Sequence, residues 1–255
     1  MGFVRQTAVL VIVSVLACGG IACRSDGDRL EVPTPDPREY VDLRFTALNA
    51  TDVDHVILGG YLSQVDRRAE GILLRTENGG DRWYRVGSET FNFDDFIVQC
   101  IHFNDSLRGW VAGVRTIDGE TLPTVIRTDD GGGHWREAVI PHDRKTIVTT
   151  LADLRFESDE TGRVTIYFSE PASGELTANV YESTDGGHRW IIKDFIDPAA
   201  AGPTDPGEQY VSEFEAYRID RPLPNGTQIL YFTGTKGQTW VPRSQFHVTN
   251  VLSWY

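Results

Sequence analysis

A short glycine-containing stretch recurs three times in this chain of 255 residues. It is TENGGDRW at 76–83, TDDGGGHW at 128–135 and STDGGHRW at 183–190. In each copy a Ser or Thr precedes an Asp or Asn by two positions, adjacent glycines follow, and a Trp ends the stretch. Short side-chain oxygens accept hydrogen bonds from turn N–H groups, and glycine permits the positive φ that a tight turn needs. The motif therefore predicts a tight turn that is built once per structural unit.

Sequence typical of β-strands surrounds each copy. The runs GILLRT, PTVIRT and TANVYES come directly before the three turns, and the Trp after each turn can begin a further strand. Two more sets of runs lie in phase upstream: HVILGG, GWVAGV and VTIYFS, preceded by YVDLRFTAL, FIVQCIHFN and LADLRFESD. Each unit thus contains four candidate strands, a pattern typical of repeat folds whose units share a core.

A fourth, degenerate copy begins at Tyr210 with YVSEFEAYRI and QILYFTGTK. Two registers compete for its final aromatic residue: Trp254, or Trp240 at the end of TGTKGQTW. We favour Trp254, because that register keeps three strands ahead of the aromatic residue.

The chain is therefore predicted to be an all-β propeller of about four four-stranded blades over residues 40–255. The expected blades are about 40–92, 95–147, 149–198 and 210–255. The 25 Gly and 12 Pro residues suit such a turn-rich fold. An open edge would invite aggregation, so the run DRLEVPTP at 28–35 is expected to pair with the fourth blade. The alternative is an incomplete propeller.

The repeated turn resembles a known family motif. The frame Ser/Thr-x-Asp-x-Gly-x-x-Trp is similar to the Asp-box, or BNR repeat, of sialidases, sortilin-type receptors and photosystem II assembly-factor-like propellers. The segment GWVAGVRTIDGETLPTVIRTDDGGGHW is most similar to the last group. The likeness covers residues 40–255 and departs from the motif at Asn78, which replaces Asp. It implies that the box lies between the third and fourth strands, away from the face that usually binds ligands. The box residues expected to be structural are Thr76, Asn78, Gly80, Trp83, Thr128, Asp130, Gly132, Trp135, Ser183, Asp185, Gly187 and Trp190.

The N-terminus resembles a bacterial export signal. Residues 1–23 contain one cation and an apolar run that ends in small residues and cysteine. Both Cys18, after Val-Leu-Ala, and Cys23, after Gly-Ile-Ala, resemble the lipidation site of a lipoprotein. Residues 24–39 are then a polar tether with several prolines. We expect an exported protein, periplasmic or on the cell surface, with an N-terminal lipid anchor; a plain secretory signal is the alternative.

Charge and motifs limit the possible chemistry. The formal net charge of −13 argues against nucleic acid or an anionic membrane surface as the main partner. The sequence lacks a G-x-S-x-G elbow, H-E-x-x-H, a P-loop and C-x-x-C. His134 and His188 occupy the same position of two boxes and so belong to separate blades. No metal and no cofactor are expected, and Cys100 is expected to be a buried free thiol.

These observations favour a non-catalytic lipoprotein propeller that binds a protein or another ligand, in the manner of an assembly factor. Its partner would be an unidentified protein or glycan. The alternative is a glycoside hydrolase of sialidase-like type or a carbohydrate-binding propeller. The string RIDRP at 218–222 does not match the Arg-Ile-Pro motif of sialidases.

The usual blade order places certain loops on the ligand-binding face. They join the second strand to the third, and the fourth strand to the next blade. Cations beside exposed aromatic residues suit recognition of a polypeptide or an acidic ligand. Alternatively the charges only solvate the loops and the aromatic residues close the channel mouth. The candidate binding residues are Arg67, Arg68, Phe91, Phe93, Arg144 and Lys145.

Overall fold

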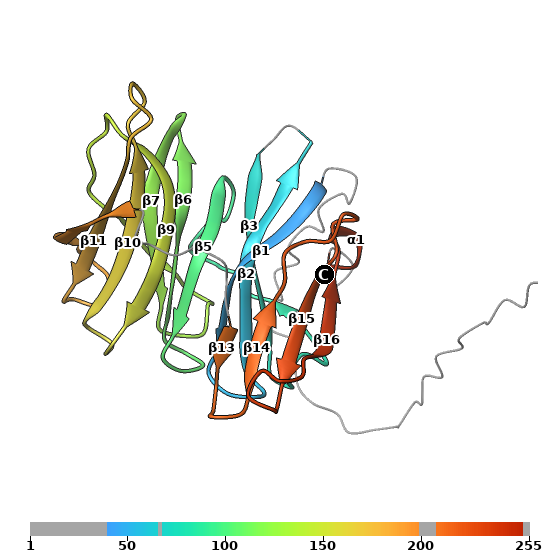
Figure 1. Ribbon diagram of the computed structural model, residues 1–255. Coiled ribbons are helices and arrows are strands. Elements are labelled where there is room, and N and C mark those ends of the chain that lie inside the picture. Colours follow the sequence, from blue (N-terminus) through green and yellow to red (C-terminus); the bar gives the residue numbers. More distant parts are fainter. Residues whose placement is uncertain (1–39, 66–67, 199–207, 252–255) are drawn as a thin grey trace, which may run out of the picture. The chain divides into compact units, whose positions relative to one another are not determined.

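The computed structural model describes residues 40–65, 68–198 and 208–251 (Figure 1). The predicted signal segment, the tether, the strand at 28–35, Arg67 and Trp254 lie outside these residues. No helix in the described ranges has the length and apolarity needed to cross a membrane.

Four antiparallel sheets of four strands each make up the described fold, and in every sheet the strands lie side by side in chain order (Figure 1). The predicted all-β, four-blade propeller fold is confirmed. Blade 1 contains β1 (Tyr40–Ala50), β2 (Val56–Gln64), β3 (Ala69–Thr76) and β4 (Tyr84–Arg85). Blade 2 contains β5 (Phe96–Phe103), β6 (Gly109–Ile117), β7 (Glu120–Thr128) and β8 (Arg136–Val139). Blade 3 contains β9 (Ile147–Phe156), β10 (Gly162–Ser169), β11 (Leu176–Ser183) and β12 (Ile191–Ile196). Blade 4 contains β13 (Glu208–Tyr210), β14 (Ala216–Ile219), β15 (Gln228–Thr233) and β16 (Val241–Phe246), followed by the short helix α1 (Val248–Val251).

The repeated motif forms the turn between the third and fourth strands of each blade. In blade 3 the Ser183 hydroxyl oxygen accepts the N–H of Gly187 at 2.8 Å, and Asp185 Oδ1 accepts the N–H of Arg189 at 2.9 Å. Gly186 and Gly187 have φ angles of 74° and 92°, which side chains would oppose. The turns of blades 1 and 2 repeat these bonds.

The fourth blade repeats the same turn with threonines. Thr233 Oγ1 accepts the N–H of Gly237 at 3.1 Å, and Thr235 Oγ1 accepts the N–H of Thr239 at 2.9 Å. The register that ends at Trp240 is therefore the one the chain adopts, and the register that ends at Trp254 is wrong. Thr235 provides the acceptor that Asp or Asn provides in the other three turns, so this copy lacks the residue that identifies the motif in the sequence.

Three hydrophobic clusters hold the blades together, joining blade 4 to blade 1, blade 1 to blade 2, and blade 2 to blade 3. Between blades 2 and 3, the ring of Trp110 stacks on Phe156 at 3.8 Å and its Nε1 donates to the Gly186 carbonyl at 2.9 Å. Between blades 4 and 1, the buried Gln228 side chain bonds both backbone groups of Phe45, at 2.6 and 3.1 Å. The motif turns thus also serve as contact points between blades.

We expect Ser183→Ala to lower the free energy of unfolding by about 1–3 kcal/mol, because the buried N–H of Gly187 loses its acceptor. Urea unfolding followed by tryptophan fluorescence measures this. Ser173→Ala is the matched control, since Ser173 accepts the Glu175 N–H in an exposed loop where water can replace it. Equal effects of the two substitutions would contradict a structural role for the motif hydroxyl.

Candidate functional site

A groove of about 580 Å³ opens between blade 1 and blade 4. It is bordered by the start of β1, by the loop between β14 and β15, and by the start of α1. This loop joins the second and third strands of its blade, so the groove lies on the face where the propeller resemblance places ligands. The lining residues are Val41, Asp42, Leu43, Arg44, Arg221, Pro222, Leu223, Pro224, Asn225, Gly226, His247 and Val248.

Asp42 and Arg44 form one wall of the groove. Both lie on β1, and Asp42 Oδ1 accepts the N–H of Leu43 while Oδ2 accepts Arg44 Nε, each at 3.0 Å. The hydrogen bond that Arg44 donates to Asp42 raises the pKa of Arg44 above its ordinary value, so the guanidinium stays charged. The pair therefore presents a fixed carboxylate beside a fixed cation.

Gly226 leaves the space opposite this wall open. Its φ is +80°, and a Cβ at this position would lie 3.8 Å from His247 Nε2 and 3.9 Å from Asp42 Oδ1. The other imidazole nitrogen, Nδ1, is held by Thr249, whose hydroxyl oxygen lies at 2.9 Å and whose amide nitrogen lies at 3.3 Å. His247 Nε2 and a carboxylate oxygen of Asp42 therefore both lie close to Gly226 in the groove lining.

The remaining rim combines apolar and polar groups. Pro222 and Leu223, the latter 48% exposed, supply apolar surface, and Arg221 and Asn225 supply polar groups. Asn225 Oδ1 accepts the N–H of Thr227 at 3.1 Å, which orients the amide and shapes the loop. A groove with apolar walls and a few oriented polar groups is typical of a small-molecule or saccharide site.

The five described candidate binding residues lie outside the groove lining. Arg68, Arg144 and Lys145 are exposed in other loops, and Arg144 forms an exposed ion pair with Glu120 at 3.3 Å. The sequence did not predict the groove residues, because they come from the two ends of the described chain and carry no recognised motif.

The expectation of exposed aromatic residues is wrong for Phe91. Its side chain is 7% exposed and meets Phe93 and Phe96 edge to face at 5.0 and 5.4 Å. The cause is backbone pairing: Gly71 N–H bonds the Phe93 carbonyl at 2.8 Å, which draws this loop onto the blade. Phe93 is half-buried in the same cluster, so these rings fill the core between blades 1 and 2.

Cys100 is a free thiol, as predicted. Its Sγ donates to the Leu151 carbonyl of blade 3 at 3.2 Å, and burial raises the pKa of the thiol to about 12. The thiol is therefore protonated at neutral pH and is not a nucleophile. Within the described ranges, no group of three or more His, Cys, Asp or Glu side chains is arranged to hold a metal ion.

No protein-family model matches the chain. No curated protein matches it either. Among solved structures, it is similar to the Niastella koreensis GH74 enzyme, with 16% identity and a TM-score of 0.35 over 78% of this chain. A polysaccharide lyase, an ulvan lyase, is 9% identical with a TM-score of 0.42 over 78% of this chain. The Penicillium chrysogenum α-L-arabinanase is 13% identical with a TM-score of 0.43 over 84% of this chain. The chain spans only 29%, 54% and 64% of these three proteins, respectively.

These neighbours correct the functional prediction. They are glycoside hydrolases and a lyase, a finding that contradicts the non-catalytic, assembly-factor-like module as the main interpretation. The likeness itself, at these identities, is one of fold, and it supports a propeller without supporting the photosystem II assembly-factor-like assignment.

His134 has a separate role in the turn of blade 2. Its Nδ1 lies 2.6 Å from Asp130 Oδ2 and its Nε2 lies 3.3 Å from Glu89. The hydrogen bond with Asp130, followed by the charge of that carboxylate, raises the pKa of His134 above 6.5. The contribution of this pair to stability is thus fully present below pH 6.5 and is lost as the pH rises through the raised value.

We expect the His134 ring to titrate above 6.5 in an NMR pH series of the folded protein, because its protonated form is bonded on both nitrogens. Asp130→Asn should lower that midpoint. A midpoint of His134 that Asp130→Asn leaves unchanged would contradict the assignment.

Proposed function

We propose that this domain is a carbohydrate-active enzyme that binds a sugar chain in the groove between blades 1 and 4. One observation carries the proposal: Asp42 Oδ1 and His247 Nε2 both lie within 4 Å of the position that a Cβ on Gly226 would take, and all three residues line the groove. The groove thus brings a carboxylate and an imidazole together in one lining.

Carbohydrates match the rest of the lining. Sugar hydroxyl groups donate and accept hydrogen bonds, so they fit the carboxylate of Asp42 and the guanidinium of Arg44. The C–H surface of a sugar ring fits the apolar surface of Pro222 and Leu223. The mixture of oriented polar groups and apolar surface supports a saccharide over a purely apolar ligand.

Asp42 and His247 can supply the base and the acid that cleavage of a sugar chain requires. Cleavage of a glycosidic bond needs a proton for the departing oxygen and a base for the attacking water. His247 Nε2 can donate a proton to the departing oxygen, while Nδ1 is held by the hydroxyl and the N–H of Thr249. Asp42 then accepts the proton of the water whose oxygen bonds to the sugar carbon. Asp42 is the one carboxylate among the described lining residues, so the imidazole takes the part that a second carboxylic acid has in most glycosidases.

We expect His247→Ala and Asp42→Asn each to lower kcat by about 10²–10⁴-fold, the usual contribution of a positioned acid or base. The measurement is release of reducing ends from soluble arabinan and ulvan, probes that represent neutral and uronate-containing polymers.

His142→Ala is the matched control, because its ring stacks near Phe168 in blade 3, away from the groove. It should leave turnover unchanged. Absence of turnover by the wild-type protein on both polymers, or full turnover by the Asp42 and His247 variants, would overturn the proposal.

We also propose that the protein is exported and anchored by a lipid at Cys18 or Cys23, in keeping with an enzyme that meets polysaccharides outside the cell. Mass spectrometry of the mature N-terminus in the native host is expected to find a diacylglyceryl cysteine. Cys18→Ser and Cys23→Ser, tested singly, decide between the two sites, because only one of them should abolish membrane partitioning. An unacylated mature chain in the soluble fraction would contradict the anchor.

A further inference from the structure

The first strand of one blade is bonded to the first strand of the next through bulged residues. Thr46 lies at a register shift in β1, and its hydroxyl donates to the Val98 carbonyl of β5 at 2.5 Å. Gln99 lies at the matching shift in β5, and its Oε1 accepts the Leu151 N–H of β9 at 2.7 Å. The side chain at this position thus reaches the backbone of the following blade.

Asp153 occupies the matching position in blade 3. It lies in the register shift of β9, has a φ of 54°, and is exposed. In the described part of the chain its carboxylate has no hydrogen bond and no ion pair. The residue is therefore placed like Thr46 and Gln99, with an acceptor whose backbone partner is missing.

A second series of contacts starts on the second strand of each blade. Ile57 shares a buried cluster with Trp135 of blade 2, Trp110 stacks on Phe156 of blade 3, and the Tyr217 hydroxyl donates to the Val53 carbonyl of blade 1 at 2.5 Å. Each of these three residues is the second residue of the second strand in its blade, and its side chain faces the next blade. We call this side of a blade its leading face.

Blade 3 has Arg163 at this position, and Arg163 is directly opposite Arg155 in the β9–β10 pairing. Like charges that face each other across strands destabilise a sheet. Within the described residues neither arginine has an ion pair or a side-chain hydrogen bond, and the buried Nε of Arg163 has no acceptor. The leading face of blade 3 also holds Glu182, which is in register with Arg163 but is bonded to Lys193 at 3.2 Å, so the two arginines have no carboxylate of their own.

The opposite, trailing face of blade 4 is charged where the other blades are apolar. The third residue of the second strand is Leu58, Val111 or Val164 in blades 1 to 3, and each of these is 0% exposed. In blade 4 the same position is occupied by Arg218. Arg218 is paired in register with Glu208, whose side chain is 41% exposed, and lies 2.9 Å from Asp220, whose side chain is 45% exposed. This face offers two carboxylates with room for further cations.

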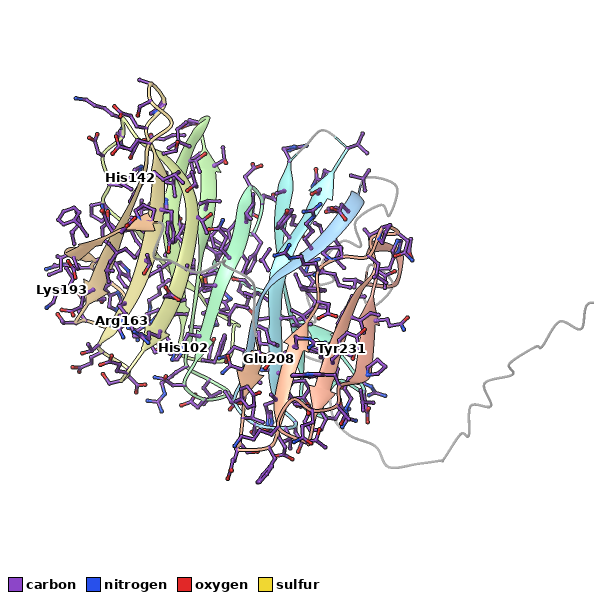
Figure 2. The ribbon with its side chains drawn as sticks, in the orientation of Figure 1. His102, His142, Arg163, Lys193, Glu208 and Tyr231 are labelled. Carbon is purple, nitrogen blue, oxygen red and sulfur yellow. The ribbon has the colours of Figure 1, made fainter. Side chains whose placement is uncertain are left out.

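We propose that the leading face of blade 3 binds the trailing face of blade 4 in a second copy of this chain. Charge complementarity identifies the partner, since Arg155 and Arg163 require the kind of carboxylates that Glu208 and Asp220 present. Figure 2 shows Arg163 and Lys193 on blade 3 and Glu208 and Tyr231 on blade 4. In the described part of one chain, the three hydrophobic clusters join the other pairs of neighbouring blades, and none of them joins blade 3 to blade 4. Ile191, paired beside Glu182 on the leading face, is 63% exposed. Asp153 then accepts a backbone N–H of the partner, as Gln99 does within the chain.

Native mass spectrometry of the full chain, released from detergent micelles, tests this interface. The wild-type protein is expected at the mass of two chains. Arg163→Glu should give single chains, because it places an acid against Glu208 of the partner subunit, and Glu208→Arg should do the same. The double variant Arg163→Glu with Glu208→Arg should restore the dimer through the reversed pair.

Arg189→Glu is the matched control, since Arg189 is exposed in the turn motif of the same blade and lies outside the leading face. It should leave the dimer intact. Ile191→Asp, a substitution at an exposed position, repeats the test without altering the arginines, and circular dichroism verifies that every variant is folded. A wild-type mass of one chain at about 100 µM, or a dimer that survives both single charge reversals and Ile191→Asp, would overturn the proposal.

Discussion

The buried hydrogen bond from a glycine N–H to the hydroxyl oxygen at the start of each turn motif supports the rest of the structure. In blade 3 this oxygen is that of Ser183, which is 1% exposed, and it accepts the Gly187 N–H across a turn that only glycine enters readily. The turn directs Trp190 into the core, where its ring meets Phe156 edge to face. Its Gly186 carbonyl then receives Trp110 of the preceding blade. A local turn thereby determines both a blade and its junction with the neighbour.

The junction between blades 4 and 1 is built differently, and the groove follows from that difference. Gln228 is a buried polar side chain that bonds the backbone of Phe45 twice. Its Oε1 accepts the Phe45 N–H, and its Nε2 donates to the Phe45 carbonyl. Such a bidentate contact fixes β15 against β1 and so fixes the loop that precedes β15. Gly226 in this loop lies close to both Asp42 on β1 and His247 after β16, and the three residues border the groove. The candidate site is therefore a property of the contact between two blades, and neither blade has it alone.

The polar exceptions among the blade faces have a common explanation. Ile57, Trp110 and Tyr217 occupy equivalent positions and are covered by a following blade, whereas Arg163 is not. Burying a charged group without a partner costs several kcal/mol, so arginine at this position is compatible only with water or with an anion. The same reasoning applies to Arg218 and Glu208 at the other end of the blade order. The chemistry of the terminal faces thus differs from that of the internal ones because their surroundings differ.

The sequence by itself determined the fold class and the turns. Those features depend on residues close in the chain: Ser183, Asp185 and the glycines that follow form their hydrogen bonds within eight positions, and strand patterns are equally local. Even so, the sequence predicted the wrong register for the degenerate copy at Thr233. The acceptor there is Thr235, which takes the place of the Asp or Asn that identifies the motif in the other copies. Only the tertiary structure decided the site. Asp42 and His247 are separated by most of the chain, the loop that carries Phe91 is drawn inside by the backbone bond between Gly71 and Phe93, and both outcomes depend on long-range contacts that no local pattern encodes.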